Sequence, residues 1–196
     1  MKRVVLYGDS NTWGYNEPMG GIRFENRWPK LLKGYEIVEE GLNGRTTVFD
    51  NNYPYRNGIK GFGYVLLAQK PVDLLVIALG INDLGFTDAQ GSAEGLRQLL
   101  ELLEDTVKNF PSSSTDIFTD EKRVLVIPAV AVEGSEESYK LAEAYKKVAE
   151  EYGCYYLDPN QDPSITLCPN GVHLDENGHK NMAKIVQAKL DEIFSE

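Results

Sequence analysis

Four short segments of the chain contain residue types that acyl-transfer chemistry uses. Gly8-Asp9-Ser10 offers a serine hydroxyl as a nucleophile, and His173, near the other end of the chain, is the candidate base for its proton. Between them lie Gly44, whose backbone N–H can approach a ligand closely, and Asn82, whose side-chain N–H can stabilise an oxyanion. Together these groups are the parts needed to cleave an ester through a covalent acyl intermediate.

Each of these residues also has an ordinary structural interpretation. Ser10 can cap a helix, Gly44 can belong to a simple Asn-Gly turn, and Asn82 can form a turn with the aspartate that follows it. The chain has only two histidines, and the second, His179, is expected inside a helix on a solvated or packed face. Ser10 also lacks the glycine two positions later that the G-x-S-x-G elbow of α/β-hydrolases requires. The combination of the four segments therefore means more than any one of them.

The hydrophobic pattern places these segments at the ends of predicted strands. Short apolar runs predict strands at residues 4–7, 35–39, 72–79, 123–128 and 154–157. Helical spacing predicts helices over residues 96–110, with Phe110 ending the apolar stripe, over residues 136–152, and onward from Asp175, the expected N-cap. The glycine-rich residues 50–63 and the serine-rich residues 111–119 are expected to be surface loops.

Alternating strands and helices predict an α/β fold, a three-layer α/β/α sandwich on a flavodoxin-like, doubly wound, five-stranded parallel sheet. Residues 72–79 are nearly all apolar, which is typical of a central strand covered on both faces. In such sheets ligands bind beyond the carboxyl ends of the strands, which is where the chemically useful segments fall. No repeat or linker divides the chain, so residues 1–196 are expected to form a single domain.

Composition excludes several other classes of function. With 20 Lys and Arg against 30 Asp and Glu the net charge is −10, which disfavours nucleic acids and anionic membranes as partners. No apolar stretch approaches the roughly 20 residues that cross a bilayer, and the first apolar run is too short for a signal segment. The two cysteines, Cys154 and Cys168, suggest neither a disulfide framework nor a metal site. A cytoplasmic location is expected.

In this order the four segments resemble the four blocks of the SGNH (GDSL) hydrolase superfamily, whose Ser, Gly, Asn and His correspond to Ser10, Gly44, Asn82 and His173. The resemblance covers almost the entire chain. Four stretches are most similar to the arylesterase/acyltransferase branch of that superfamily: Arg27-Trp28, residues 39–47, Arg56-Asn57-Gly58 and residues 79–83.

The resemblance implies a serine esterase. Ser10 would attack the ester carbonyl while His173 takes its proton, and the N–H groups of Ser10 and Gly44 would form an oxyanion hole with the side chain of Asn82. Three neighbours are expected to support these residues or to border the substrate: Asp9, Trp13 and Asn43. The resemblance implies a small-molecule ester as the binding partner, no metal or organic cofactor, and assembly into a homo-oligomer.

The chain departs from the family pattern at Asn170, because the family places an aspartate three residues before the histidine. An aspartate fixes the histidine tautomer, and in a serine protease of another fold its change to asparagine lowers kcat about 10⁴-fold. The chain can be an engineered inactive variant, a natural enzyme with a Ser-His pair, or a member that has lost catalysis. Deamidation of Asn170, which Gly171 follows, would restore the acid in a fraction of molecules, whereas the nearby Asp175 has poor geometry. We expect Asn170 to weaken hydrolysis without abolishing the site.

The substrate is only weakly encoded. The family resemblance suggests short acyl groups, acetyl especially, removed from or transferred between aryl, alkyl or carbohydrate alcohols. Five aromatic residues can border the site, although loop packing explains them equally well: Trp13, Tyr15, Tyr53, Tyr55 and Phe62. The alternatives are a thioesterase or lysophospholipase of the same superfamily, and a non-catalytic carbohydrate-binding member. A flavodoxin-like cofactor-binding domain is disfavoured, because no phosphate-binding glycine loop has the required spacing.

Overall fold

The computed structural model of the protein describes residues 1–109 and 115–195. Its central sheet has five parallel strands in the order β4-β1-β5-β6-β7. The bounds of these strands are Lys2–Gly8 for β1, Tyr35–Gly41 for β4, Leu74–Leu79 for β5, Val124–Pro128 for β6 and Tyr155–Tyr156 for β7. All five predicted strands are confirmed, and their order is that of a flavodoxin-like doubly wound sheet.

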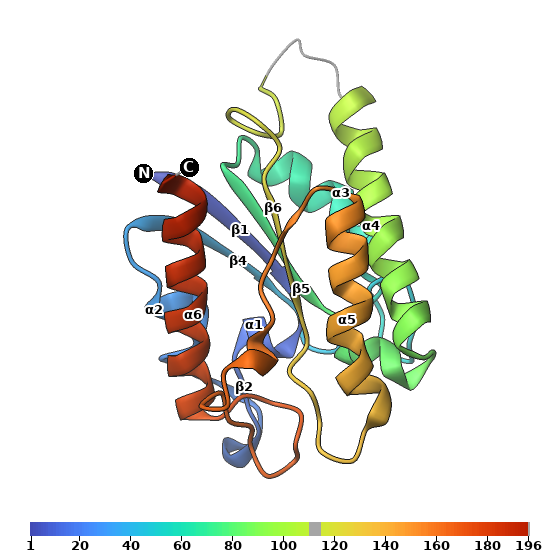
Figure 1. Cartoon of the computed structure of the whole chain (residues 1–196), viewed down its shortest axis with the longest axis vertical. Coiled ribbons are helices and arrows are strands. Elements are labelled where there is room, and N and C mark those ends of the chain that lie inside the picture. The colour runs from blue at the N-terminus through green and yellow to red at the C-terminus, as the bar shows by residue number, and fades with distance from the viewer. Residues whose placement is uncertain (110–114, 196) are drawn as a thin grey trace.

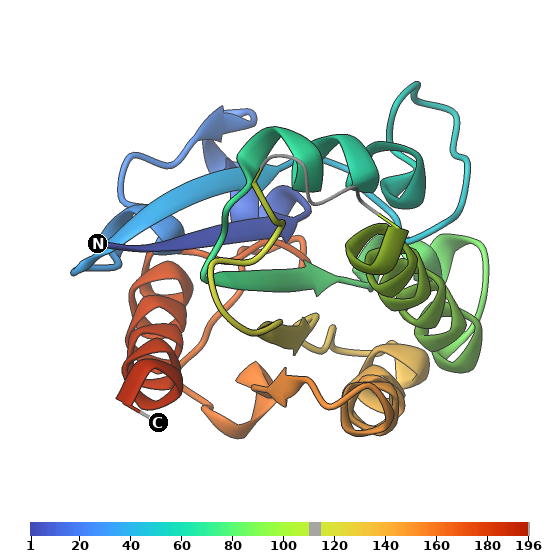
Figure 2. The same cartoon turned by 90° about the horizontal axis from the view of Figure 1, so that it is seen from above.

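Helices cover both faces of the sheet and make a three-layer sandwich (Figure 1). The helices α3 (Gly58–Gln69), α4 (Ala89–Asn109) and α5 (Glu136–Glu151) pack on one face. The short α2 (Trp28–Leu31) and the long α6 (Glu176–Ser195) pack on the other, and Figure 2 shows α6 across the sheet from α4 and α5. Smaller elements complete the described chain: α1 (Ser10–Trp13), the hairpin β2 (Tyr15–Asn16) and β3 (Ile22–Arg23), and 3-10 helices at Glu17–Met19, Ile81–Gly85 and Pro159–Gln161.

The two cores alternate along the strands with the period of two that a pleated strand imposes. In β5, Leu75 and Ile77 face the core of α3, α4 and α5, whereas Leu74 and Val76 face the core of α2 and α6. All four side chains are fully buried. The continuous apolar run of this strand is therefore explained by its position at the centre of the sheet, covered on both sides.

The predicted helices form, with small differences at their ends. The helix predicted from residue 96 already begins at Ala89 in α4, while Phe110 lies outside the described residues. Ser135 caps α5 by accepting from the N–H of Ser138. Asp175 caps α6 as predicted, because its Oδ1 accepts from the N–H of Gly178 at 2.7 Å.

Two loop predictions need correction. The predicted loop 50–63 ends early, because α3 begins at Gly58. Phe62 lies in this helix with no exposed surface and packs on the Tyr7 ring at a centroid distance of 5.0 Å, so it cannot border a substrate. In the predicted loop 111–119, residues 111–114 lie outside the described part of the chain, and Ile117 and Phe118 are buried beside β5.

The carboxyl ends of β1, β4 and β5 lie level with one another, since Gly8 pairs with Gly41 on one side and with Ala78 on the other. The short helix α1 follows β1 directly and packs over the end of β4. A Cβ atom on Gly41 would lie 2.4 Å from the backbone nitrogen of Trp13, so only glycine lets α1 approach this closely. The carboxyl ends of these strands, together with α1, therefore determine where the candidate site lies.

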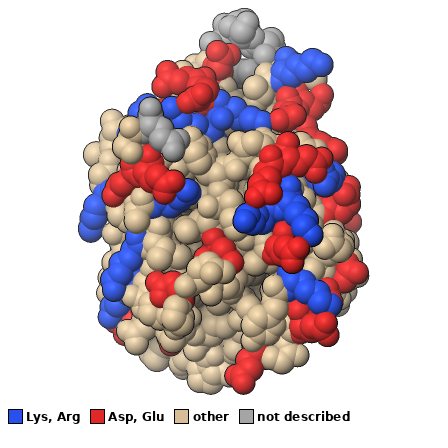
Figure 3. All heavy atoms as spheres, in the orientation of Figure 1, with Lys and Arg blue, Asp and Glu red and all other residues tan. Residues whose placement is uncertain are grey.

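Charge is distributed rather than gathered. On the face drawn in Figure 3 acidic and basic side chains lie intermixed over the helices, in agreement with the even spread of acid along the sequence. None of the helices in the described parts of the chain is long and apolar enough to cross a bilayer.

Candidate active site

Ser10 is the first residue of α1 and is almost fully buried, with 4% of its surface exposed. The cap of this helix is Asp9, whose Oδ1 accepts from the N–H of Asn11 at 2.9 Å. The capping role that sequence alone allowed for Ser10 therefore belongs to its neighbour, and the Ser10 hydroxyl is left for other contacts. Burial raises the pKa of Asp9 to about 7, against the lowering effects of the Asn11 N–H and of Arg45.

The Ser10 hydroxyl meets His173 across 163 positions of sequence, with Oγ 3.1 Å from Nε2. This is the distance at which a base can take the proton of a nucleophile. The Tyr15 ring lies against the imidazole at a centroid distance of 4.5 Å and a tilt of 38°. Burial lowers the pKa of His173, and the negative charge of Glu17 acts in the opposite direction.

Asn170 occupies the position of the expected acid and contacts the same imidazole. Its Nδ2 lies 2.8 Å from Nδ1 of His173, while its Oδ1 accepts from the N–H groups of Val172 at 3.0 Å and of His173 at 3.2 Å. Among the described residues, only Ser10 and Asn170 hydrogen-bond to the His173 ring. Asp175 does not substitute, because Thr166 and Gly178 engage its carboxylate.

The turn that contains Asn170 is closed by its own backbone. The N–H of Gly171 donates to the carbonyl of Cys168 at 2.8 Å, and the N–H of Cys168 donates to the carbonyl of His173 at 2.7 Å. Deamidation of Asn170 needs the Gly171 nitrogen to attack the side-chain carbonyl carbon. That nitrogen is held by Cys168 here, so the folded turn opposes the reaction that the Asn-Gly sequence favours.

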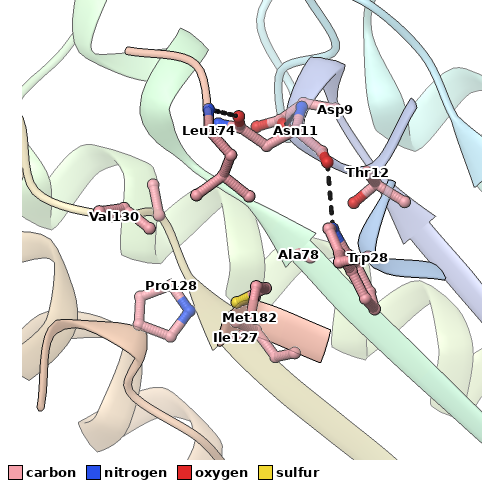
Figure 4. Close-up of a pocket in the computed structure, with 11 residues that line it drawn as sticks. Asp9, Asn11, Thr12, Trp28, Ala78, Ile127, Pro128, Val130, Leu174 and Met182 are labelled. Carbon is pink, nitrogen blue, oxygen red and sulfur yellow. Dashed lines mark hydrogen bonds between the residues drawn. The ribbon is translucent and has the colours of Figure 1, made fainter. Parts of the chain in front are cut away.

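Asn11 holds the histidine loop, a role that the sequence did not reveal. Its Nδ2 donates to the carbonyl of Val172 at 3.1 Å, and its Oδ1 accepts from the N–H of Leu174 at 2.8 Å. One side chain thus binds the backbone on both sides of His173, and Figure 4 shows the contact with Leu174. The only available signal was that Asn11 follows Ser10, since the groups it binds lie more than 160 positions away.

Gly44 and Asn82 belong to loops that are joined to each other and to the end of β1. Gly44 has a φ of +75°, in the left-handed region that favours glycine. Asn82 Nδ2 donates to the carbonyl of Arg45 at 3.0 Å. In turn, Nη1 of Arg45 donates to the carbonyl of Gly8 at 2.9 Å, two residues before Ser10. The four predicted residues thus gather at one edge of the sheet.

Asp83 holds the loop that contains Gly44 in place. Sequence reasoning treated this residue only as a turn partner of Asn82. It is fully buried and accepts from Thr47 at both N–H (2.8 Å) and Oγ1 (2.7 Å), and from Oγ of Ser92 at 2.6 Å. Burial raises its pKa although the hydrogen bonds from Ser92 and Thr47 favour the charged form. A buried carboxylate with three donors is a rigid support for the loop that contains Gly44.

The other predicted neighbours have different surroundings. The carbonyl of Trp13 accepts from Nε of Arg23 at 2.6 Å, so this residue ties α1 to β3. Oδ1 of Asn43 is buried with no hydrogen-bond partner among the described residues. Tyr53 and Tyr55 are 69% and 90% exposed, so they extend into solvent instead of packing the loop.

A small cavity of about 30 Å³ lies behind α1, with room for about one water molecule (Figure 4). Its lining is mainly apolar and comes from both ends of the chain: Asp9, Asn11, Thr12, Trp28, Ala78, Ile127, Pro128, Ala129, Val130, Leu174 and Met182. Neither Ser10 nor His173 lines it, so this cavity does not hold a substrate against the nucleophile. In the described ranges no cluster of three or more His, Cys, Asp or Glu is placed to hold a metal ion.

Comparison with known proteins identifies the family of the chain. Residues 6–180 match the sequence model of the GDSL-like lipase/acylhydrolase family. The chain belongs to this family. Membership confirms the resemblance found in the sequence.

Proteins similar to this chain include esterases of several kinds. It is 25% identical to an acetylxylan esterase of Xylanibacter ruminicola over 96% of its own length and only 43% of that protein. A carbohydrate acetylesterase family member from Sinorhizobium meliloti is 29% identical, with a TM-score of 0.82 and full coverage of both chains. An aryl esterase of M. smegmatis shares the fold, with a TM-score of 0.83 at 24% identity over 98% of this chain and 99% of that one.

Proposed function

We propose that the protein is a serine esterase that removes short acyl groups through an acyl-enzyme on Ser10. The observation that carries this proposal is the 3.1 Å contact between Ser10 Oγ and His173 Nε2 at the carboxyl edge of the sheet. A hydroxyl is a weak nucleophile until a base within hydrogen-bond reach activates it.

In this mechanism Ser10 Oγ attacks the ester carbonyl and its proton passes to Nε2 of His173. The carbonyl oxygen becomes an oxyanion, which the N–H groups of Ser10 and Gly44 and the side chain of Asn82 stabilise. The protonated imidazole then gives its proton to the leaving alcohol, and the acyl group stays on Ser10. Water, or a second alcohol in the case of transfer, attacks this intermediate by the same route in reverse.

Acetyl esters of carbohydrates or aryl alcohols are the proposed substrates. The names of an acetylxylan esterase and of a carbohydrate acetylesterase family member among the relatives support acetyl as the acyl group. The exposed Tyr53 and Tyr55 lie in the loop that Asn51 ties to Gly44, through a hydrogen bond of 3.0 Å from Nδ2 to the Gly44 carbonyl. Aromatic faces at that position suit the alcohol part of a sugar or aryl ester.

The test is turnover of an activated acetyl ester, p-nitrophenyl acetate, by the parent, Ser10→Ala and His173→Ala proteins. We expect measurable turnover by the parent and its loss in both variants, together with labelling of Ser10 by a fluorophosphonate probe. Thr12→Ala, which changes a buried hydroxyl two residues further along α1, is the control for disturbance of the helix. Turnover that survives Ser10→Ala would contradict the mechanism.

A second candidate is a non-catalytic carbohydrate-binding member, which the amide at position 170 favours. The fluorophosphonate distinguishes the two functions, because a protein whose serine is not activated does not react with it. A folded parent protein that is neither labelled nor active, but binds a carbohydrate, would support the binding function.

A further inference from the structure

The orientation of the Asn170 side chain is determined by its backbone partners. Two backbone N–H groups, from Val172 and His173, point at one atom of the amide, at 3.0 and 3.2 Å. Only the amide oxygen can accept from both. Turning the amide by half a rotation would set its NH2 group against two N–H donors, so the NH2 group must face the imidazole.

This orientation selects one form of the imidazole. Nδ2 of Asn170 lies 2.8 Å from Nδ1 of His173 and has only protons to offer, so Nδ1 must be the nitrogen without a proton. A neutral imidazole has a single N–H. Its proton is therefore on Nε2, which faces Ser10 Oγ at 3.1 Å, and the ring donates to the hydroxyl from which it must take a proton.

We propose that Asn170 is a positioning residue that holds resting His173 in the tautomer with its proton on Nε2, and so keeps the site in a slow state. The proposal rests on the esterase function above. To work as a base the ring must move its proton to Nδ1, and that N–H then opposes the NH2 of Asn170. The imidazolium that follows attack has the same conflict, since both of its nitrogens are donors.

An aspartate at position 170 would remove the conflict without rearranging the loop. Its two oxygens both accept, so one can keep the N–H groups of Val172 and His173 while the other accepts from Nδ1 of the ring. With its proton on Nδ1, the neutral imidazole can accept at Nε2 from the Ser10 hydroxyl. Burial also lowers the pKa of His173, against the negative charge of Glu17, and this favours the neutral ring in which the tautomer matters.

The direct test is ¹⁵N NMR of histidine-labelled protein at about pH 8, where an ordinary imidazole is neutral. The His173→Ala spectrum identifies the His173 signals against those of His179. We expect the wild-type ring to be protonated at Nε2 and the Asn170→Asp ring at Nδ1. A wild-type ring protonated at Nδ1 would overturn the proposal, whatever the esterase activity.

Kinetics supply the second readout. We expect Asn170→Asp to raise kcat on p-nitrophenyl acetate by on the order of 10²–10⁴-fold, the upper figure being the effect of the corresponding change in a serine protease. Asn177→Asp, an exposed site with the same charge change, should leave kcat within about twofold because it does not touch the ring. Equal Ser10-dependent rates for wild type and Asn170→Asp would overturn the slow state. If neither has Ser10-dependent turnover, the esterase function fails, while the NMR result still decides the tautomer.

Discussion

The imidazole of His173 lies among three side chains, and each sets a different property of the ring. Nε2 of the ring contacts the Ser10 hydroxyl, and Asn170 determines which ring nitrogen holds the proton. Tyr15 packs on one face of the ring and limits the rotation of the imidazole. The choice between an active and a slow site thus depends on the chemistry of a single exposed side chain, although the geometry of the pair is complete.

The second histidine is a structural residue with a clear pH signature. His179 is fully buried on α6, where Nδ1 accepts from the N–H of Trp28 at 3.3 Å and the Phe24 ring packs edge-on at 4.9 Å. Its Nε2 has no hydrogen-bond partner in the described parts of the chain. Burial lowers its pKa to about 4, with Asp175 raising it and Arg27 lowering it further.

We expect this burial to make the protein less stable in acid. Between the ordinary pKa of 6.5 and the folded value of about 4, the unfolded chain binds a proton at this histidine and the native chain does not. The free energy of unfolding therefore decreases as the pH is lowered through this interval. The His179 contribution is about 3 kcal/mol over that interval, at 1.36 kcal/mol per pKa unit. Urea unfolding at several pH values should show a shallower loss for His179→Gln, which keeps an acceptor for Trp28. Parallel pH profiles for the two proteins would contradict this account.

At the scale of elements, the site depends on a connection between the first helix and the last loop. The two hydrogen bonds of Asn11 are the side-chain link from α1 to the backbone of Val172 and Leu174, on either side of His173. Neither β1 nor α6 positions the histidine loop in this way. The residue next to the nucleophile therefore helps to set the distance between nucleophile and base.

We expect Asn11→Ala to lower kcat by at least about tenfold, because a misplaced base takes the serine proton poorly. Its unfolding free energy should fall by about 1–3 kcal/mol, at 0.5–1.5 kcal/mol for each hydrogen bond lost. Asn181→Ala is a matched control, since Asn181 donates to the backbone of Ser164 at 2.7 Å in a different loop. The measurements are p-nitrophenyl acetate turnover well below the melting temperature and urea unfolding. Equal loss of kcat in both variants would contradict a specific role for Asn11.

The elements themselves could largely be predicted from the sequence. The strands were found because buried parallel strands are short, continuous apolar runs, and α5 because its apolar stripe is regular. The helix α3 was missed, because glycines at 58, 61 and 63 lower helix propensity and imitate a loop. What holds it is tertiary packing, of Phe62 and Leu66 into the core.

The site could be predicted only in part, for a related reason. Ser10 and His173 follow from residue type and from position at the sheet edge. The roles of Asn11 and Asp83 depend on backbone groups that only the folded chain brings near them. The direction of the Asn170 amide depends on two N–H groups of a turn whose shape no spacing rule specifies.

At the scale of the whole molecule, a buried polar network joins the site to the helical layer. Asp83 binds Thr47 beside the Gly44 loop and Ser92 on α4, and the Ser92 hydroxyl lies 2.9 Å from the hydroxyl of Tyr145 on α5. The edge of the sheet, its second loop and two helices thus share one set of hydrogen bonds. Such networks specify a single arrangement when every member is satisfied.

We expect the two ends of this network to respond differently to substitution. Tyr145→Phe removes one hydrogen bond and should lower the unfolding free energy by about 1 kcal/mol with kcat unchanged. Asp83→Ala removes the acceptor of three hydrogen bonds and leaves the N–H and hydroxyl of Thr47 unpaired, so it should cost about 3 kcal/mol or more and also lower kcat as the Gly44 loop loosens. Urea unfolding and ester turnover measure both effects. An Asp83→Ala protein with full activity would show that this loop needs no support from the network.

The 163 positions between Ser10 and His173 also bear on how the protein is made. The nucleophile is synthesised well before its base, and contacts this far apart in sequence form late in folding. A nascent or truncated chain that lacks His173 therefore has a serine without its candidate base. The same separation means that fluorophosphonate labelling of Ser10 can follow refolding. In the proposed mechanism Ser10 becomes reactive only when the loop that contains His173 has packed against α1.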